Sequence, residues 1–400
     1  MSIKILQVTA AYKPAYIYGG PTMSVAKLCE VLVQNQRQLA NSNNDLELAV
    51  YTTTANGKTE LNVVPNKNTL IDNVKVTYFK RLTKDHTHFS PALLLALRSE
   101  ILRSTKNKKK LIIHIHAWWN LVSIFSCAIA KWYNVPVLLT PRGMLTAYTN
   151  TNRNSLAKKI IHNALGKNLL KYCHIHATSE KEKSDILSII NPKSITVIAN
   201  LVELSDYSYV NPIIKQTSTN DILPFQLIYL SRIEEKKGLE LLFEALVDLP
   251  FNYNLTIAGS GQEQYVEKLK IKAETLKISD KITWAGQVRK EDKFNLLANH
   301  DLMILTSYNE NFANVVIESL SVGTPVLLSN EVGLADYVAE KKLGWITGLT
   351  PDNIKKDIIL TFKSSELRNI IRKKAPLIIK QDFDSKILIK KYFTLYSQIN

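Results

Sequence analysis

Two carboxylates in the second half of the chain have the spacing of a ligand-binding pair. Residues 310–318 read ENFANVVIE, so seven residues separate Glu310 from Glu318. An apolar strand pattern, Leu302–Leu305, precedes this segment, and a helix pattern contains Glu318 but not Glu310. The free amides at a helix start bind anions. A carboxylate on either side of such an anion suits one ligand with hydroxyl groups at both ends, which is the layout of a nucleotide sugar.

Basic residues and glycines follow other predicted strands and could bind the phosphates of the same ligand. Arg232 and Lys237 lie five apart in SRIEEKKG, where paired cations could neutralise a leaving diphosphate. Gly19 and Gly20 follow the first strand and precede a helix, so their backbone amides could approach a phosphate closely. An ordinary charged surface turn and a plain tight turn would explain these two motifs about as well.

Two further motifs at strand ends are weak by themselves. Gly259 belongs to a Gly-Ser-Gly at a strand-to-helix junction, and a lone G-x-G carries little information. Val288 follows the next strand, where the backbone could contact a nucleobase. Both therefore depend on the stronger motifs for their interpretation.

The first half contributes histidine and arginine candidates. His114 and His116 end a strand with one residue between them, so both imidazoles should point to one face. Metal binding would need a third and usually a fourth ligand, which the sequence does not provide, so no metal site is predicted. Because Trp118 and Trp119 follow, His116 could hydrogen-bond a sugar, although core packing explains the two Trp residues nearly as well. Arg142, in PRGML, could grip an acceptor carboxylate or phosphate, or could form a structural ion pair.

Alternating strands and helices must position these residues. Short apolar runs alternate with amphipathic stretches throughout, which predicts an α/β protein with mainly parallel sheets. The pattern restarts after a polar tract that ends at Pro224, so two doubly wound domains are expected, with the ligand at the carboxyl ends of both sheets, in the cleft. The predicted divisions are residues 1–203, residues 204–384 and a C-terminal helix, residues 385–400.

Composition is that of a soluble globular protein. The chain has 400 residues and 46% hydrophobic content, which suits two domains. Its longest apolar stretch, Ala117–Ala130, is too short to span a membrane, and the N-terminus lacks the apolar core of a signal peptide. Three scattered cysteines imply no disulfide framework. A cytoplasmic protein is therefore expected.

The positive charge is confined to the first half. Residues 1–200 hold 26 Lys and Arg against 10 Asp and Glu, whereas residues 201–400 hold 25 of each class. Such a field attracts anionic surfaces, including acidic lipids, phosphorylated acceptors and nucleic acid. A solvated basic face without a partner is the alternative.

The order of the motifs resembles that of the retaining glycosyltransferases of family 4, which have the GT-B fold. In chain order they read GGP, HIHAWW, PRGML, SRIEEKKG, AGSG, WAGQV and ENFANVVIESLSVGTPV. The resemblance covers most of the chain and is strongest from about Leu227 to Val338, and PRGML is similar to members acting in bacterial polysaccharide assembly. It implies two Rossmann-like domains facing a central cleft, with the C-terminal helix crossing back to the first domain.

The resemblance also implies a role for each motif. Glu310 would position or polarise the donor sugar, which His116 would also contact, and Glu318 would hold the ribose hydroxyls. Arg232 and Lys237 would stabilise the diphosphate leaving group, and Arg142 would bind the acceptor. The remaining donor contacts are expected at Gly19, Gly20, Gly259, Val288, Asn311, Phe312, Ala313 and Asn314.

Two positions depart from the family pattern. Ala313 stands where the family often has glycine, which adds a methyl group where the backbone would meet the diphosphate. The Asn-Gly of the interdomain hinge is replaced by Asn200-Leu201, so the flexibility of the hinge should differ.

The implied activity is metal-independent, retaining transfer of a hexose-type sugar from a nucleotide diphosphate, with a UDP-sugar favoured over a GDP-sugar. The acceptor would be a glycan or a lipid-linked glycan in cell-surface polysaccharide synthesis, with no cofactor and no nucleic acid as a partner. The basic first half leaves open a peripheral association with the inner face of the plasma membrane. The alternatives are another GT-B enzyme, such as a nucleotide-sugar epimerase or a phosphorylase, and a non-catalytic protein that binds glycan or nucleic acid.

Overall fold

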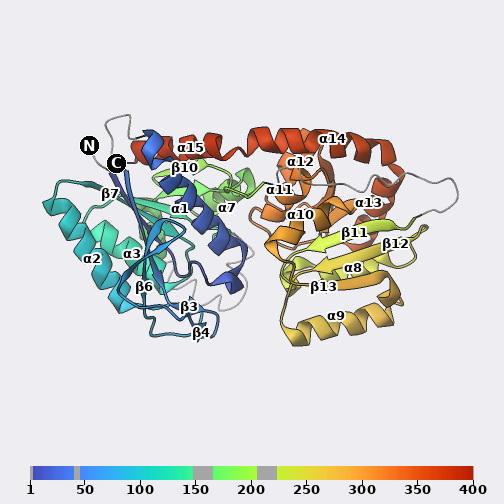
Figure 1. The fold of residues 1–400 in the computed structure, drawn as a ribbon, viewed down its shortest axis with the longest axis horizontal. Coiled ribbons are helices and arrows are strands. Elements are labelled where there is room, and N and C mark those ends of the chain that lie inside the picture. The colour runs from blue at the N-terminus through green and yellow to red at the C-terminus, as the bar shows by residue number, and fades with distance from the viewer. Residues whose placement is uncertain (1–2, 40–45, 147–164, 205–222, 400) are drawn as a thin grey trace. The chain divides into compact units, whose positions relative to one another are not determined.

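The chain forms two compact units in the computed structural model, which describes residues 3–39, 46–146, 165–204 and 223–399 (Figure 1). The first unit comprises Met1–Leu201 together with Ser385–Asn400, and the second comprises Val202–Asp384. The C-terminal segment thus belongs to the first unit, although it follows the second in sequence.

An eight-stranded sheet forms the centre of the first unit, in the order β10-β9-β8-β7-β1-β2-β6-β5. All neighbouring strands are parallel except β5, which is antiparallel to β6. The short strands β3 and β4 pair separately. The strands are β1 (Ile3–Val8), β2 (Leu46–Thr53), β3 (Ala55–Asn56), β4 (Thr59–Glu60), β5 (Asn68–Ile71), β6 (Val74–Phe79), β7 (Lys110–His116), β8 (Val137–Thr140), β9 (His174–Ala177) and β10 (Ser194–Val197).

Helices cover both faces of this sheet, as the alternation along β7 illustrates. Ile113 and Ile115 pack into a hydrophobic core with α2, α3 and α7, whereas His114 and His116 point to the opposite face. Their rings lie 4.1 Å apart between centroids, so the prediction that both imidazoles share one face is confirmed. The helices are α1 (Gly20–Leu39), α2 (Pro91–Lys106), α3 (Leu121–Trp132), α6 (Lys167–Tyr172), α7 (Glu180–Ile189) and α15 (Ser385–Gln398).

The second unit contains a six-stranded parallel sheet in the order β13-β12-β11-β14-β15-β16. This is the strand order of a dinucleotide-binding Rossmann sheet. The strands are β11 (Phe225–Leu230), β12 (Tyr253–Ala258), β13 (Ile282–Gly286), β14 (Leu302–Leu305), β15 (Val326–Ser329) and β16 (Gly344–Thr347). The helices are α8 (Leu239–Leu246), α9 (Glu263–Thr275), α10 (Lys290–Ala298), α11 (Asn314–Ser321), α12 (Ala335–Lys341), α13 (Pro351–Lys363) and α14 (Ser365–Asp382).

The predicted class, two Rossmann-like doubly wound α/β domains, is confirmed. The sequence pattern also predicts a helix at Leu156–Leu170. Most of that range lies outside the described residues, and α6 covers its last part. Within the described part of the chain, none of the helices has both the length and the apolar character needed to cross a bilayer.

The helix α15 is fixed to the sheet of the first unit by buried polar contacts. The hydroxyl of Tyr396 lies 2.8 Å from Nδ1 of His114 and accepts a hydrogen bond from Nε2 of Gln7 at 3.2 Å. The hydroxyl of Tyr392 lies 3.3 Å from Nε2 of His176. Because all five side chains are buried, the helix is an integral layer of this unit.

Candidate functional site

The carboxyl ends of β11 and β14 form the topological switch point of the second unit. These strands are hydrogen-bonded neighbours, yet the chain adds β12 and β13 on one side before it returns to form β14 on the other. In open α/β sheets, ligands bind in the crevice at such a point. The loops that follow the two strands, residues 231–238 and 306–313, contain Arg232, Lys237 and Glu310.

Lys237 and Glu310 meet at this point as an ion pair, in which Nζ of the lysine donates a hydrogen bond to Oε2 of the glutamate. Their side chains are only 7% and 19% exposed. Burial alone would raise the pKa of Glu310, but the charges of Lys237, Lys236 and Arg232 outweigh it and hold this pKa below the ordinary value. A mostly buried cation and a charged carboxylate therefore lie side by side at the switch point.

Backbone contacts hold the two loops together. The amide of Tyr308 donates to the carbonyl of Lys236 at 2.9 Å, and the hydroxyl of Thr306 donates to the carbonyl of Gly238 at 2.9 Å. Gly238 has φ 67°, and a Cβ there would lie 2.1 Å from the carbonyl oxygen of Thr306. Only glycine allows this approach, so Gly238 fixes the position of the preceding Lys237.

The backbone of Glu310 is held from a third loop. Its amide donates to the carbonyl of Glu331 at 3.2 Å, and its own carbonyl accepts from the amide of Gly333 at 2.7 Å. The loop carboxylate is therefore attached to the segment that follows β15.

Arg232 is oriented by its own loop. Its Nη1 donates to Oε1 of Glu234 at 2.6 Å, and its side chain is 39% exposed. Gly259 lies against this loop, since a Cβ at that position would be 1.8 Å from the carbonyl oxygen of Ser231. Close packing beneath Arg232 therefore explains the glycine at 259, and its predicted contact with a donor remains a prediction.

Phe312, Ala313 and Asn314 lead into α11 as the sequence indicated. Phe312 is buried, with its ring 6.2 Å from that of Phe383. Asn311 and Asn314 are half-buried. The amide of Val316 donates to the carbonyl of Ala313 at 2.9 Å. A helix start is in general suited to an anion.

Ala313 adopts φ 65° and ψ 76°, a left-handed conformation that favours glycine. Ala313→Gly is therefore expected to raise the free energy of unfolding by about 1 kcal/mol, as measured by urea denaturation. The matched control is Ala339→Gly, which places glycine inside α12 and should lower stability by a similar amount. A lower stability of the Ala313→Gly protein would contradict the assignment of strain.

Glu318 has a partner that sequence reasoning missed. Its Oε1 accepts a hydrogen bond from Nζ of Lys293 at 2.6 Å, and both side chains are largely buried. This ion pair joins α11 to α10. Nothing in the spacing of the two residues, 25 apart in the chain, indicates that they meet.

Val288 lies just beyond β13, the strand at one edge of the sheet, and is half-buried. Gly286, which ends that strand, accepts a hydrogen bond at its carbonyl from the amide of Gly259 at 2.7 Å. The structure thus brings the two weaker motifs together beside the loop of Arg232. Together with Lys237, Glu310 and the start of α11, they lie along the carboxyl edge of one sheet.

In the first unit, Gly19 and Gly20 lie between β1 and α1. Gly19 has φ 65°, so its conformation alone favours glycine. Gly20 is different, because it is exposed, and a Cβ there would meet none of the described atoms within 4 Å apart from its chain neighbours and the backbone of its own helix. Packing does not require glycine at position 20, whereas close approach of a ligand would.

Gly20→Ala is therefore expected not to lower the melting temperature, since Gly20 begins α1 and alanine favours a helix, and to weaken nucleotide-sugar binding by about tenfold. The added methyl group would keep a phosphate away from the backbone amide. Thermal denaturation and calorimetric titration measure the two quantities. A loss of stability with unchanged affinity would assign this glycine to folding instead.

His116 is buried and Arg142 is half-buried, and the two contact each other, with Nη2 of the arginine 3.3 Å from Nδ1 of the imidazole. Nε2 of His116 lies 2.6 Å from Oε1 of Gln7. Arg142 also donates to Oγ of Ser24 at 2.7 Å and to Oδ1 of Asn200 at 3.3 Å. These hydrogen bonds give Arg142 structural partners other than the expected ion pair, and its binding of an acceptor remains a prediction.

Burial, with the charges of neighbouring histidines and Arg142, holds the pKa of His114 and of His116 well below the ordinary value. The pKa of His176 falls to about 3, mainly through burial. All three rings are therefore neutral at physiological pH. No group of three or more His, Cys, Asp or Glu residues in the described ranges is arranged to hold a metal ion.

The Trp pair is divided between core and surface. Trp118 is buried in the hydrophobic core, as the packing alternative expected. Trp119 is half-buried, and its Nε1 donates to the carbonyl of Met144 at 2.7 Å. These contacts connect the HIHAWW and PRGML segments.

Glu182 is a structural residue whose role the sequence showed only in part. Ser179 followed three residues later by Glu182 predicts a capping box, and Ser179 does cap α7 by accepting a hydrogen bond from the amide of Glu182. The carboxylate of Glu182 instead accepts from the amide of Gly143 and from the amide of Thr178, both at 2.7 Å. It thereby holds the turn that contains Arg142.

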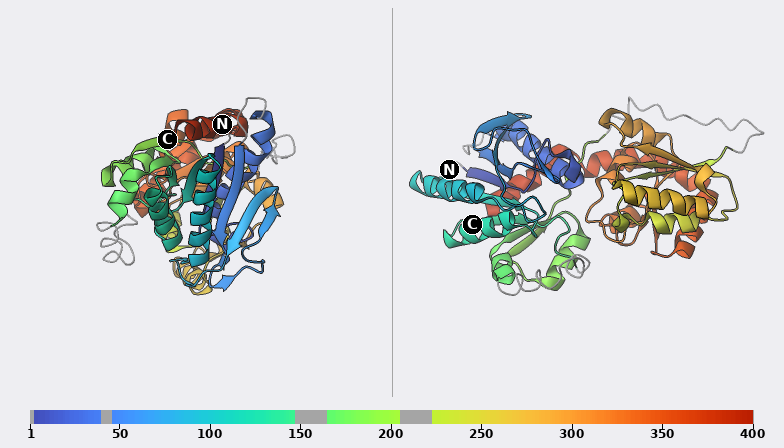
Figure 2. Two further views of the ribbon diagram at one scale, coloured as in Figure 1. Left: turned by 90° about the vertical axis from the view of Figure 1, so that its left-hand side faces the viewer. Right: turned by 90° about the horizontal axis from the view of Figure 1, so that it is seen from below.

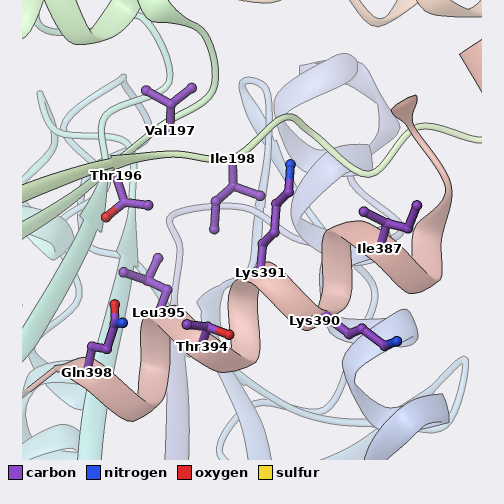
Figure 3. A pocket seen from close by; sticks show the side chains of 9 residues that line it. All are labelled: Thr196, Val197, Ile198, Ile387, Lys390, Lys391, Thr394, Leu395 and Gln398. Carbon is purple, nitrogen blue, oxygen red and sulfur yellow. The ribbon is translucent and has the colours of Figure 1, made fainter. Parts of the chain in front are cut away.

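An open groove of about 430 Å³ lies between β10 and α15 (Figure 3). Lys391 reaches up beside Ile198 in this view, while Lys390 extends away. The other lining residues are Thr196, Val197, Ile387, Thr394, Leu395 and Gln398. Since this lining includes neither a carboxylate nor a histidine, the groove has no evident catalytic chemistry.

Two family models match consecutive parts of the chain. Residues 29–206 match Glycosyltransferase Family 4, and residues 212–377 match Glycosyl transferases group 1. The Mycobacterium tuberculosis glycogen synthase is 25% identical over 267 residues, which are 63% of this chain and 62% of that protein. The chain spans about three fifths of the length of the curated relatives that it matches first.

Solved structures resemble the chain over nearly its whole length. Sucrose-phosphate synthase from Thermosynechococcus elongatus has a TM-score of 0.71 at 17% identity, covering 99% of this chain and 98% of that one. Anabaena HepE, solved with UDP and glucose, has a TM-score of 0.70 at 17% identity, covering 98% and 99%. The predicted GT-B fold is thereby confirmed. On this GT-B fold, the chain has a region that matches Glycosyltransferase Family 4, followed by a region that matches Glycosyl transferases group 1.

Proposed function

We propose that this protein is a retaining glycosyltransferase that moves a sugar from a nucleotide diphosphate sugar, with UDP favoured, to a glycan or lipid-linked acceptor. The observation that carries the proposal is the buried Lys237–Glu310 pair at the switch point of the second unit. It combines a cation for the leaving diphosphate with a charged carboxylate for the hydroxyl groups of the sugar.

Donor binding would exchange the partners within this pair. The diphosphate would take the place of the Glu310 carboxylate at Nζ of Lys237, and the released carboxylate would accept hydrogen bonds from the donor sugar. Arg232, whose side chain is partly exposed beside Glu234, would add a second cation on the same side. The amides at the start of α11 would complete the anion site.

The reaction then needs little proton transfer from the protein. The bond between the anomeric carbon and the diphosphate oxygen breaks, and the acceptor oxygen bonds to the same carbon on the same face. The acceptor proton passes to the leaving phosphate oxygen, so that charge builds on the diphosphate and is stabilised by the two cations. The proposed mechanism therefore includes no side-chain base and no metal ion.

The known relatives support this donor class. The structure of Anabaena HepE contains UDP and glucose, and it resembles this chain in fold. The PRGML segment remains the basis for proposing an acceptor in bacterial cell-surface polysaccharide synthesis.

The test is a panel of UDP-, GDP- and ADP-sugars, scored by thermal shift and by release of the nucleoside diphosphate. We expect one nucleotide sugar to stabilise the protein and to be hydrolysed slowly in the absence of an acceptor. Conversion to an isomeric nucleotide sugar would indicate an epimerase. If no member of the panel binds, the proposed function is wrong.

A further inference from the structure

The outer faces of α2 and α3 expose unusually large apolar side chains. The two helices lie side by side on one face of the first sheet and pack against each other (Figures 1 and 2). Leu95 and Leu102 are 64% and 45% exposed on α2, and Phe125 and Trp132 are 36% and 83% exposed on α3. The members of each pair are seven residues apart and therefore lie on the same side of their helix.

These four exposed side chains are not part of the hydrophobic core on which the two helices pack. The inward positions of α2 are already filled by Leu93, Leu97 and Ile101, which are buried against the sheet. Single exposed apolar residues are common on soluble proteins, whereas four of them on two helices that pack against each other give a reason to look for an interaction site. We call the outward surface of α2 and α3, with the loop 107–109, the α2–α3 face.

The α2–α3 face is also strongly basic. On α2 and α3, Glu100 is the one acidic residue, and it is 3% exposed and paired with Lys4 at 2.8 Å. No carboxylate of these helices is therefore available to a partner. The cations of the face are Arg98, Arg103, Lys106, Lys108, Lys109 and Lys131. Two of them have carboxylate partners, since Arg103 pairs with Glu100 at 3.3 Å and Lys109 with Glu47 at 3.4 Å.

We infer that the α2–α3 face binds the surface of an anionic lipid bilayer. Helices that lie on a membrane combine aliphatic and Trp side chains with Lys and Arg, because the apolar groups enter the acyl boundary while the cations contact phosphates. Each cation near an anionic leaflet contributes about 1 kcal/mol. Two copies of so basic a face would repel each other, so a second copy of this chain does not fit it.

The inference extends the proposed function. Its biological purpose rests on the proposed lipid-linked acceptor, but the binding of the bilayer itself does not. A transferase held on the bilayer by this face would meet such an acceptor where it is anchored. Binding of vesicles requires neither donor nor acceptor, and the two claims can therefore fail separately.

Sedimentation with vesicles tests the inference. We expect the full chain to pellet with vesicles of phosphatidylcholine and phosphatidylglycerol but not with phosphatidylcholine alone. Trp132→Ala should weaken this binding by about tenfold, since a largely exposed Trp side chain would lose its insertion. Replacing Lys106 and Lys108 by Gln should weaken it further and reduce its dependence on salt. The matched control is Leu377→Ala, which removes a 72% exposed apolar side chain from α14 in the second unit and should change nothing.

Three results would overturn the inference. They are no binding to the anionic vesicles, equal loss of binding in the Trp132→Ala and Leu377→Ala proteins, and displacement of the vesicles by duplex RNA at similar affinity. The last result would assign the face to nucleic acid. Donor hydrolysis by the Trp132→Ala protein in solution should equal that of the unmodified chain, which separates membrane binding from catalysis.

Discussion

Lys237→Met is expected to lower kcat/KM for sugar transfer by about a hundredfold to a thousandfold, the loss seen when one donor to a developing negative charge is removed. The variant also leaves Glu310 mostly buried without its cation, which should cost about 3 kcal/mol of stability. Steady-state kinetics and urea denaturation measure the two effects.

A double variant separates catalysis from folding. Lys237→Met with Glu310→Gln removes both charges, so the free energy of unfolding should recover most of the loss while activity stays low. Lys236→Met, at the neighbouring position, is the matched control. This variant should retain most activity, because Lys237 and not Lys236 is the hydrogen-bonding partner of Glu310. Restored activity in the double variant would show that the lysine acts only in folding.

The second large effect is acid destabilisation of the first unit. His176 has a pKa of about 3 in the folded protein against an ordinary 6.5, and His114 and His116 are shifted in the same direction. The unfolded chain therefore binds more protons below about pH 6.5, and stability present above that value is lost as the pH falls. At about pH 5, the shifted pKa of His176 alone should have lowered the free energy of unfolding by about 2 kcal/mol relative to neutral pH.

Hydrogen exchange in peptides from β7, β8 and β9 tests this expectation. Protection should decrease steadily between neutral pH and about pH 5, in the sheet that His114 and His176 join to α15. His176→Asn should be less stable at neutral pH but should show a flatter pH dependence, because one titrating group is gone. An unchanged pH dependence would mean that this ring is not held neutral by burial.

Periodicity was sufficient to predict the regular parts of the fold. Short apolar runs predict strands at Val137–Thr140, Phe225–Leu230 and Leu302–Leu305, and the structure has strands with these bounds, each of them mostly buried. By contrast, β5 was not predicted, since Asn68–Ile71 is an exposed edge strand without an apolar pattern. The helices α13 and α14, which lie beyond the recognised motifs, were not predicted either.

The candidate site was only partly predictable. Lys237 and Glu310 are 73 residues apart, yet both follow strands that become neighbours, so the strand-end rule brings them together. The partners of Glu318 and Arg142 could not be inferred in this way. Lys293, Ser24 and Asn200 contact them across helix and loop surfaces, where sequence spacing carries no signal. The same applies to Cys127 and Cys173, whose sulfur atoms lie 3.4 Å apart although the sequence shows them only as scattered.

Calorimetric titration of the nucleoside diphosphate selected by the donor panel tests the central claim most directly. The unmodified chain should bind it, and the Lys237→Met, Glu310→Gln double variant, which keeps the fold, should bind it at least about tenfold more weakly. Equal affinity in the two proteins would contradict the placement of the diphosphate at the Lys237–Glu310 pair.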